Sequence, residues 1–185
     1  MSIIWNRLKY VLSPQFDIYE QVSKIVRGSV ADIGCGTGFG THLLTCNAKA
    51  VTGYEIDRDA LRFAERVFPL KSLMFAYGDL QKGIDDQEFD FVVMIDVIEH
   101  LKYDKRALEN AKNMLKPNGQ LILSTPNRLS RYRKSENHVR EYGPKELEGL
   151  LKKVFIDVSL RNHLLESLTS SYQNPILSVC RKSVS

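Results

Sequence analysis

The sequence predicts a doubly wound, Rossmann-like α/β fold in a single domain. Five short runs are apolar, most of them on both faces, as in strands that are buried on both sides of a sheet, and stretches with helical spacing lie between them. Parallel neighbouring strands need a crossover connection, so this alternation favours a mostly parallel sheet with helices on both faces. The length of 185 residues fits one such domain.

Each expected element follows from a local pattern. The apolar runs predict strands at 29–34, 50–56, 72–79, 89–96 and 119–126. Helical spacing predicts one helix behind a cap at Asp57 or Asp59, and a second behind a cap at Asp104 that stops at the turn 116–119. The apolar residues with this spacing are Ala60, Leu61, Ala64 and Val67 in the first helix and Ala107, Leu108, Ala111, Met114 and Leu115 in the second. A helix from Pro144 and strands at 155–160 and 175–181 complete the fold, with an antiparallel C-terminal strand.

The N-terminal part differs from the rest of the chain. Residues 1–28 have the pattern of one or two amphipathic helices, which we expect to form a helical cap on the domain made by residues 29–185. No apolar run approaches the roughly 20 residues that span a bilayer, and no signal peptide is recognisable. The three cysteines lack metal-ligand spacing. We therefore expect a cytoplasmic protein without a membrane span, and the sequence indicates no oligomeric state.

A glycine-rich turn follows the first strand. The stretch VADIGCGTGFG, residues 30–40, contains glycines at 34, 36, 38 and 40. Ligands of doubly wound sheets lie beyond the carboxyl ends of the strands, where glycines let the backbone come close to them. A dinucleotide fingerprint would need a glycine at the position of Phe39, so the spacing argues against a dehydrogenase.

An acidic residue ends the second strand. Glu55 lies roughly 20 residues beyond Gly34, where a carboxylate can accept hydrogen bonds from both hydroxyls of a ribose. Asp57 points to the same side of the strand, and we assign it to the helix cap. The pattern fits a ligand that contains a ribose.

Motifs along the domain resemble those of the class I S-adenosylmethionine-dependent methyltransferases: in order, DIGCGTG, VTGYEID, YGDL, FDFVVMIDVIEHL and LKPNGQLILSTPN. The resemblance runs from about residue 29 to the C-terminus and implies the cofactor-binding residues. The loop glycines and the small Cys35 would lie beneath the methionine part of the cofactor, with Asp32 orienting its ammonium group. Glu55 would bind the ribose, Asp79 the adenine amino group, and Asp96 would lie near the sulfonium. The implied set is Asp32, Gly34, Cys35, Gly36, Gly38, Glu55, Ile56, Asp79, Leu80, Ile95 and Asp96.

The same resemblance implies an enzyme. Methyl transfer from a sulfonium is an in-line displacement, so the protein mainly aligns donor and acceptor and removes a proton where needed. We expect an oxygen or nitrogen of a small anionic molecule as acceptor, with His100 and His138 as base or positioning residues. The segment from Asn127 to Lys145 has six Lys or Arg against two Glu, and its loop at about 127–143 is the expected substrate lid. Its candidate substrate-binding residues are Arg128, Arg131, Arg133 and Arg140.

Two alternatives stay open. Asp96, Glu99, His100 and His138 resemble the carboxylates and histidines that hold magnesium or manganese in the RNA 3′-end 2′-O-methyltransferases, which makes nucleic acid an alternative acceptor. However, Asp96 replaces a longer glutamate. The same patterns also occur in small-molecule enzymes that resemble the ubiquinone-biosynthesis O-methyltransferases, so we favour a site without metal. The second alternative is a partner protein that binds S-adenosylmethionine without catalysis.

Overall fold

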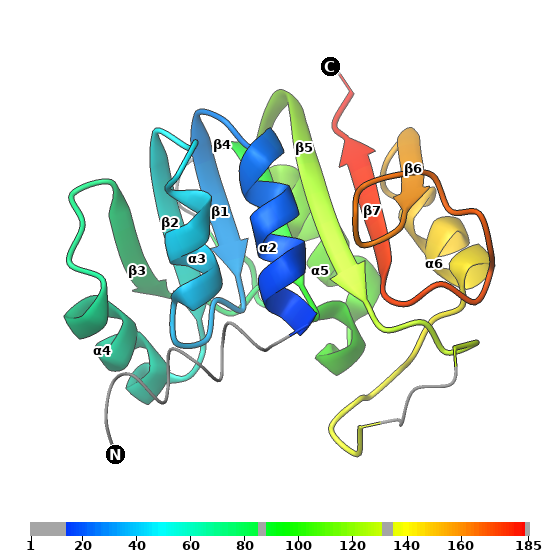
Figure 1. The fold of residues 1–185 in the computed structure, drawn as a ribbon, viewed down its shortest axis with the longest axis horizontal. Coiled ribbons are helices and arrows are strands. Elements are labelled where there is room, and N and C mark those ends of the chain that lie inside the picture. Colours follow the sequence, from blue (N-terminus) through cyan, green and yellow to red (C-terminus); the bar gives the residue numbers. More distant parts are fainter. Residues whose placement is uncertain (1–13, 85–87, 131–134, 184–185) are drawn as a thin grey trace.

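A seven-stranded sheet lies between two layers of helices (Figure 1). The structure is a computed structural model, and it describes residues 14–84, 88–130 and 135–183. None of the helices in these ranges is both long and apolar enough to cross a membrane.

The sheet has the predicted topology. Its strands are β1 (Ser29–Ile33), β2 (Ala50–Glu55), β3 (Leu73–Tyr77), β4 (Phe89–Ile95), β5 (Leu115–Thr125), β6 (Asp157–Arg161) and β7 (Ile176–Arg181). Their order across the sheet is β3-β2-β1-β4-β5-β7-β6. Strands β1 to β5 pair in parallel, and β7 lies antiparallel to both β5 and β6. A doubly wound, mostly parallel sheet with an antiparallel C-terminal strand is thereby confirmed.

The helices form one layer on each face of the sheet. They are α2 (Pro14–Ile25), α3 (Phe39–Leu44), α4 (Arg58–Val67), α5 (Asp104–Asn113) and α6 (Pro144–Leu151), with the 3₁₀ turn η1 (Ile98–His100) after β4. One apolar core joins the sheet to α2 and α3 and includes Val67 at the end of α4; the other joins it to α5 and α6. Each central strand contributes to both cores, which explains why the strands are apolar on both faces.

Of the two expected helix caps, one is confirmed and the other is wrong. Asp57 caps α4, because its carboxylate accepts hydrogen bonds from the first helical N–H groups, as predicted. Asp104 was expected to cap α5, and this is wrong: Tyr103 holds the cap position, and Asp104 is the first helical residue. Its carboxylate is occupied by side chains of the segment 135–142 instead.

The expected end of α5 is also wrong. The helix stops at Asn113, and the turn residues 116–119 lie inside β5, which begins at Leu115. Leu115 pairs with Phe89, and the register shifts before the regular pairing with β4 resumes at Gln120. Residues 114 and 115 fit the helical spacing although the helix has already ended, because the helix and the strand bury their apolar side chains in the same core.

Candidate active site

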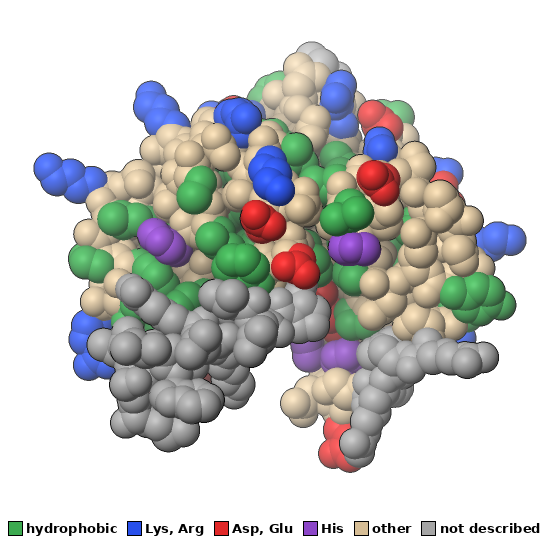
Figure 2. Space-filling model, viewed as in Figure 1, with side chains coloured by type: hydrophobic (Ala, Val, Ile, Leu, Met, Phe, Trp, Pro, Cys, Tyr) green, Lys and Arg blue, Asp and Glu red, His purple; other side chains and the backbone are tan. Residues whose placement is uncertain are grey.

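The carboxyl ends of the parallel strands meet at one edge of the sheet, the lower edge in Figure 1. Two cavities of about 490 and 270 Å³ open there, on either side of the loop that follows β1. Gly34 and Asp96 line both cavities, so the two cavities adjoin at the ends of β1 and β4. Figure 2 shows histidine side chains at this edge, between the two stretches drawn in grey.

The glycine loop is tied to the acidic residue at the end of β2. Gly36 has a φ of 53°, a conformation that glycine adopts without strain, and no atom lies within 4 Å of where its Cβ would be. Its N–H donates to Glu55 Oε2 at 3.0 Å, and the N–H groups of Ile56 and Asp57 donate to Oε1. Glu55 is thereby fixed beside the glycine loop.

Glu55 faces the smaller cavity together with residues from the β3 and β4 ends. Ile56, Asp79 and Leu80 line it as well, so the structure brings together the residues predicted for the ribose and adenine. The Asp79 carboxylate accepts the N–H of Gln81 and forms an ion pair with Lys82 at 3.0 Å. This cavity is therefore lined by apolar residues together with three acidic ones, Glu55, Asp79 and Asp96.

Asp32 lies at the bottom of the site, fully buried, and does not itself line either cavity. Its two oxygens accept hydrogen bonds from Tyr19 in α2, at 3.0 Å, and from Thr41 in α3, at 2.7 Å. Burial raises the pKa of Asp32 to about 7, against the effect of these two hydrogen bonds. Cys35 lines the larger cavity, and burial raises the pKa of its thiol far above the usual range, which fits a packing role.

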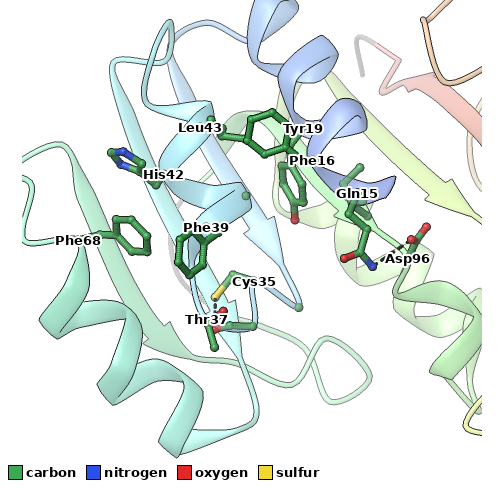
Figure 3. Close-up of a pocket in the computed structure, with 14 residues that line it drawn as sticks. Gln15, Phe16, Tyr19, Cys35, Thr37, Phe39, His42, Leu43, Phe68 and Asp96 are labelled. Atoms are coloured by element: carbon green, nitrogen blue, oxygen red, sulfur yellow. Dashed lines mark hydrogen bonds between the residues drawn. The ribbon is translucent and has the colours of Figure 1, made fainter. Parts of the chain in front are cut away.

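Asp96 sits where the two cavities join. Its φ is 53°, a left-handed conformation that is unusual for a residue with a side chain. Ser124 at the end of β5 donates to its Oδ1 at 2.7 Å, and Gln15 of α2 donates to its Oδ2 at 3.1 Å (Figure 3). The carboxylate is therefore held from two sides, at a position that a ligand in either cavity would contact.

Three of the four residues predicted as alternative metal ligands lie close together. One ligand atom from each of Glu99, His100 and His138 lies within 4.8 Å of the others, and the two imidazole rings are 5.0 Å apart. Thr125 donates to Glu99 Oε2 at 3.0 Å, whereas the buried Oε1 has no hydrogen-bond partner among the described residues. Burial raises the pKa of Glu99 to about 8. Asp96, the fourth predicted member of a metal set, is not part of this group.

The hydrogen bonds of the two histidines fix their tautomers. His100 Nδ1 lies 3.0 Å from the carbonyl oxygen of Asn137, which can only accept, so Nδ1 carries the proton. His138 Nδ1 lies 2.9 Å from the Glu141 carboxylate, which orients this ring in the same way. In both rings the Nε2 lone pair is left to act as a base or a ligand.

The basic segment 127–145 is pinned to the domain where the structure describes it. Val139 and Arg140 donate their N–H groups to the Glu99 carbonyl oxygen, and the Arg140 guanidinium pairs with Asp104 at 2.8 Å. Arg128 pairs with Glu146 at 2.8 Å. Both predicted substrate arginines in the described part of the segment therefore have carboxylate partners within the protein. Arg131 and Arg133 lie outside the described residues.

The segment starts from a buried anchor. Asn127 is fully buried, and its side-chain amide donates to the carbonyl oxygens of Ser171 and Gln173, at 2.8 and 2.7 Å. Its own N–H donates to the side chain of Asn174. The exit of β5 is thus joined to the connection that precedes β7.

Sequence reasoning expected an N-terminal helical cap but named none of its residues as part of the site. Gln15, Phe16 and Tyr19 extend from this helix along one side of the larger cavity (Figure 3). Aromatic side chains of α3 and of the residue after α4 line another part of it, with the rings of His42 and Phe68 stacked 4.7 Å apart. The available signal was the amphipathic pattern before β1, which indicates a helix but not which of its polar residues face a ligand.

The fold and a match to a family pattern define a class of protein. The sequence pattern of the methyltransferase domain family matches residues 31–123, which cover β1 to β5 except for the first two residues of β1 and the last two of β5. The chain belongs to this family.

Curated proteins with a similar sequence are also named methyltransferases. A probable S-adenosylmethionine-dependent methyltransferase of Mycobacterium tuberculosis is 29% identical over 150 residues, which are 77% of this chain and 54% of that protein. The ubiquinone biosynthesis O-methyltransferase of Coxiella burnetii is 29% identical over 125 residues, 66% of this chain and 50% of that protein. The chain thus spans about half the length of the curated relatives it matches.

Solved structures share the whole fold. A TehB-like S-adenosylmethionine-dependent methyltransferase from Corynebacterium glutamicum superposes with a TM-score of 0.74 at 20% identity, covering 96% of this chain and 94% of that one. The N-methyltransferase NodS from Bradyrhizobium japonicum, in complex with S-adenosylhomocysteine, gives a TM-score of 0.67 at 19% identity, covering 95% and 86%. At this identity the likeness concerns the fold.

Proposed function

We propose that this protein transfers a methyl group from S-adenosylmethionine to an oxygen or nitrogen of a small anionic acceptor. The observation that carries the proposal is that Asp96 and Gly34 join the cavity of Glu55 and Asp79 to the cavity beside the glycine loop. A cofactor whose ribose lies at Glu55 and whose amino-acid part lies on the loop would have its sulfonium over this junction. When bound, the sulfonium supplies a methyl group that is already activated for displacement.

The protein's own contribution is then alignment and proton removal. His100 lines the cavity of Glu55 and Asp79, and its Nε2 carries the free lone pair. We assign His100 as the base and His138, whose ring faces it, as its positioning partner. The anionic character of the acceptor is supported by the excess of basic residues in segment 127–145. Because Arg128 and Arg140 are paired, this part of the proposal depends on Arg131 and Arg133.

Calorimetry tests the cofactor first. Titration of S-adenosylhomocysteine should give micromolar binding that Glu55→Gln weakens at least tenfold, because the ribose then loses a charged acceptor, a loss of about 1.4 kcal/mol. Glu65→Gln on the exposed side of α4 is the matched control, and NAD should not bind. Absence of binding to the wild type would contradict the proposal.

Transfer of a labelled methyl group tests the acceptor. Carboxylated and phosphorylated small molecules are compared with their neutral counterparts, with His100→Ala as the variant expected to lower the rate by about 100-fold or more. A preference for neutral acceptors would exclude the anionic assignment. Tight cofactor binding without transfer to any acceptor would instead favour a protein that binds the cofactor without catalysis.

A second candidate function is metal-assisted methylation of the 2′-hydroxyl at an RNA 3′ end. The observation that favours it is the convergence of Glu99, His100 and His138, with a buried carboxyl oxygen that lacks a partner among the described residues. A carboxylate and two imidazoles are a donor set that suits manganese or zinc, and such an ion would polarise the acceptor hydroxyl.

This candidate differs from the first in its requirements. It predicts manganese binding that His138→Ala abolishes and that His163→Ala, an exposed histidine in the connection after β6, leaves unchanged. It also predicts methylation of an RNA oligonucleotide with a 2′-hydroxyl at its 3′ end, and none of the 2′-deoxy oligonucleotide. Activity that persists in a chelator would exclude it.

A further inference from the structure

The fourth glycine of the loop, Gly40, has no part in the cofactor motif, and the structure gives it a different partner. A Cβ on Gly40 would lie 2.3 Å from both Cε2 and Cζ of Tyr19, far closer than any real contact. The ring of Tyr19 therefore lies directly against the backbone of α3. Glycine at position 40 is what admits a tyrosine there.

The position of the ring brings its hydroxyl to the buried acid of the site. Tyr19 is 8% exposed, and its hydroxyl donates to Asp32 Oδ1 at 3.0 Å, while Thr41 donates to Oδ2. Among the described residues, no lysine, arginine or histidine forms an ion pair with Asp32. A buried carboxylate with only two neutral donors is incompletely compensated, and a ligand ammonium in the adjacent larger cavity would stabilise its charge.

Tyr19 also reaches the ligand side. Its side chain lines the larger cavity together with Cys35 and Gly36, on the side of the loop away from Glu55. A ligand with its ribose at Glu55 would therefore place its amino-acid end, and not its nucleoside, near Tyr19.

We propose that Tyr19 is a positioning residue for the amino-acid part of the cofactor, and that Gly40 is required to admit it. The hydroxyl links the larger cavity to the buried Asp32 carboxylate, which lines neither cavity: the hydroxyl donates to Asp32, and its oxygen is left to accept a hydrogen bond from the ligand ammonium. This inference rests on the proposed function, because it assumes a cofactor made of a nucleoside and an amino acid.

Two ligands separate a positioning role from a structural one. S-adenosylhomocysteine has both parts, whereas 5′-methylthioadenosine has the nucleoside and the thioether but no amino acid. Tyr19→Phe keeps the ring and removes only the hydroxyl, so we expect about tenfold weaker binding of S-adenosylhomocysteine and less than a twofold change for methylthioadenosine. Gly40→Ala should give the same selective loss, because the added methyl group displaces the ring.

Tyr142→Phe is the matched control. Tyr142 is also buried and also donates to a carboxylate, that of Asp104 at 2.8 Å, but it lines neither of the two cavities. This variant should change neither affinity. Equal weakening of both ligands by Tyr19→Phe, or no weakening of either, would overturn the inference. A wild-type protein that binds neither ligand would instead contradict the proposed function itself.

Discussion

Glu141 holds the imidazole of His138 through a 2.9 Å contact between Oε1 and Nδ1, with the two side chains only 6% and 9% exposed. A carboxylate in this position fixes the tautomer and the orientation of the ring, and leaves the Nε2 lone pair free. We predict that Glu141→Gln, which keeps an acceptor oxygen but removes the charge, lowers the methyl transfer rate roughly tenfold or more.

The exposed Glu136 lies in the same segment, so Glu136→Gln serves as the control. Single-turnover rates of the two variants decide the matter. Equal rates would show that the charge of Glu141 plays no part in the reaction.

Asp32 should make the free protein less stable as the pH rises. Its folded-state pKa is raised from 3.8 to about 7, so the folded protein binds more protons than the unfolded chain between these values. The stabilisation is full below about pH 4 and is lost as the pH rises through 7, an effect of roughly 2 to 4 kcal/mol. Urea unfolding of the ligand-free protein from pH 5 to 8 measures it, and Asp32→Asn should remove this part of the slope. A slope that survives the substitution belongs to another group.

Ser124 should contribute to stability through its contact with Asp96. Its buried hydroxyl donates to the Asp96 carboxylate at 2.7 Å and helps to hold a backbone conformation that is otherwise unfavourable. Ser124→Ala should lower the free energy of unfolding by about 1 to 2 kcal/mol. Ser178→Ala is a close comparison, because the buried Ser178 hydroxyl has no hydrogen-bond partner among the described residues, and its loss should cost less than about 0.5 kcal/mol. Similar costs for both would mean that the contact with Asp96 adds nothing.

The core between the sheet and α5 should be sensitive to lost volume. Leu108 is fully buried there, so Leu108→Ala should lower the free energy of unfolding by about 2 to 5 kcal/mol. The same change at Leu164, which is 46% exposed, should lower the free energy of unfolding by less than about 1 kcal/mol. Chemical denaturation of both variants gives the comparison, and a small cost at Leu108 would mean that the site collapses around the deletion.

The central strands of the sheet were predictable because both of their faces are buried, so each appears in the sequence as an apolar run between turns. The same reasoning could not place the start of β5, since residues 114 and 115 are apolar in either kind of element. Asp104 looked like a cap from its place before an apolar pattern. Its carboxylate instead binds Arg140 and Tyr142, which lie far away in the sequence, so no local pattern could predict its role.

That the residues proposed to bind the cofactor lie close together was predictable for a similar reason. Glu55, Asp79 and the loop glycines all lie at strand ends, and the order of the parallel strands brings those ends together. The roles of Tyr19 and Glu141 were not predictable, because they depend on how a helix and a loop pack on the sheet. The amphipathic pattern before β1 predicts α2 but assigns no partner to any of its polar residues.

The buried Asn127 has a consequence for the order in which the nascent chain can become active. Every residue that lines the two cavities has been synthesised by residue 101. The side chain of Asn127 at the start of the basic segment, however, is bound by carbonyl groups at 171 and 173, shortly before β7. A nascent chain that ends before residue 171 would therefore contain every residue of the two cavities but lack the contacts that bury Asn127.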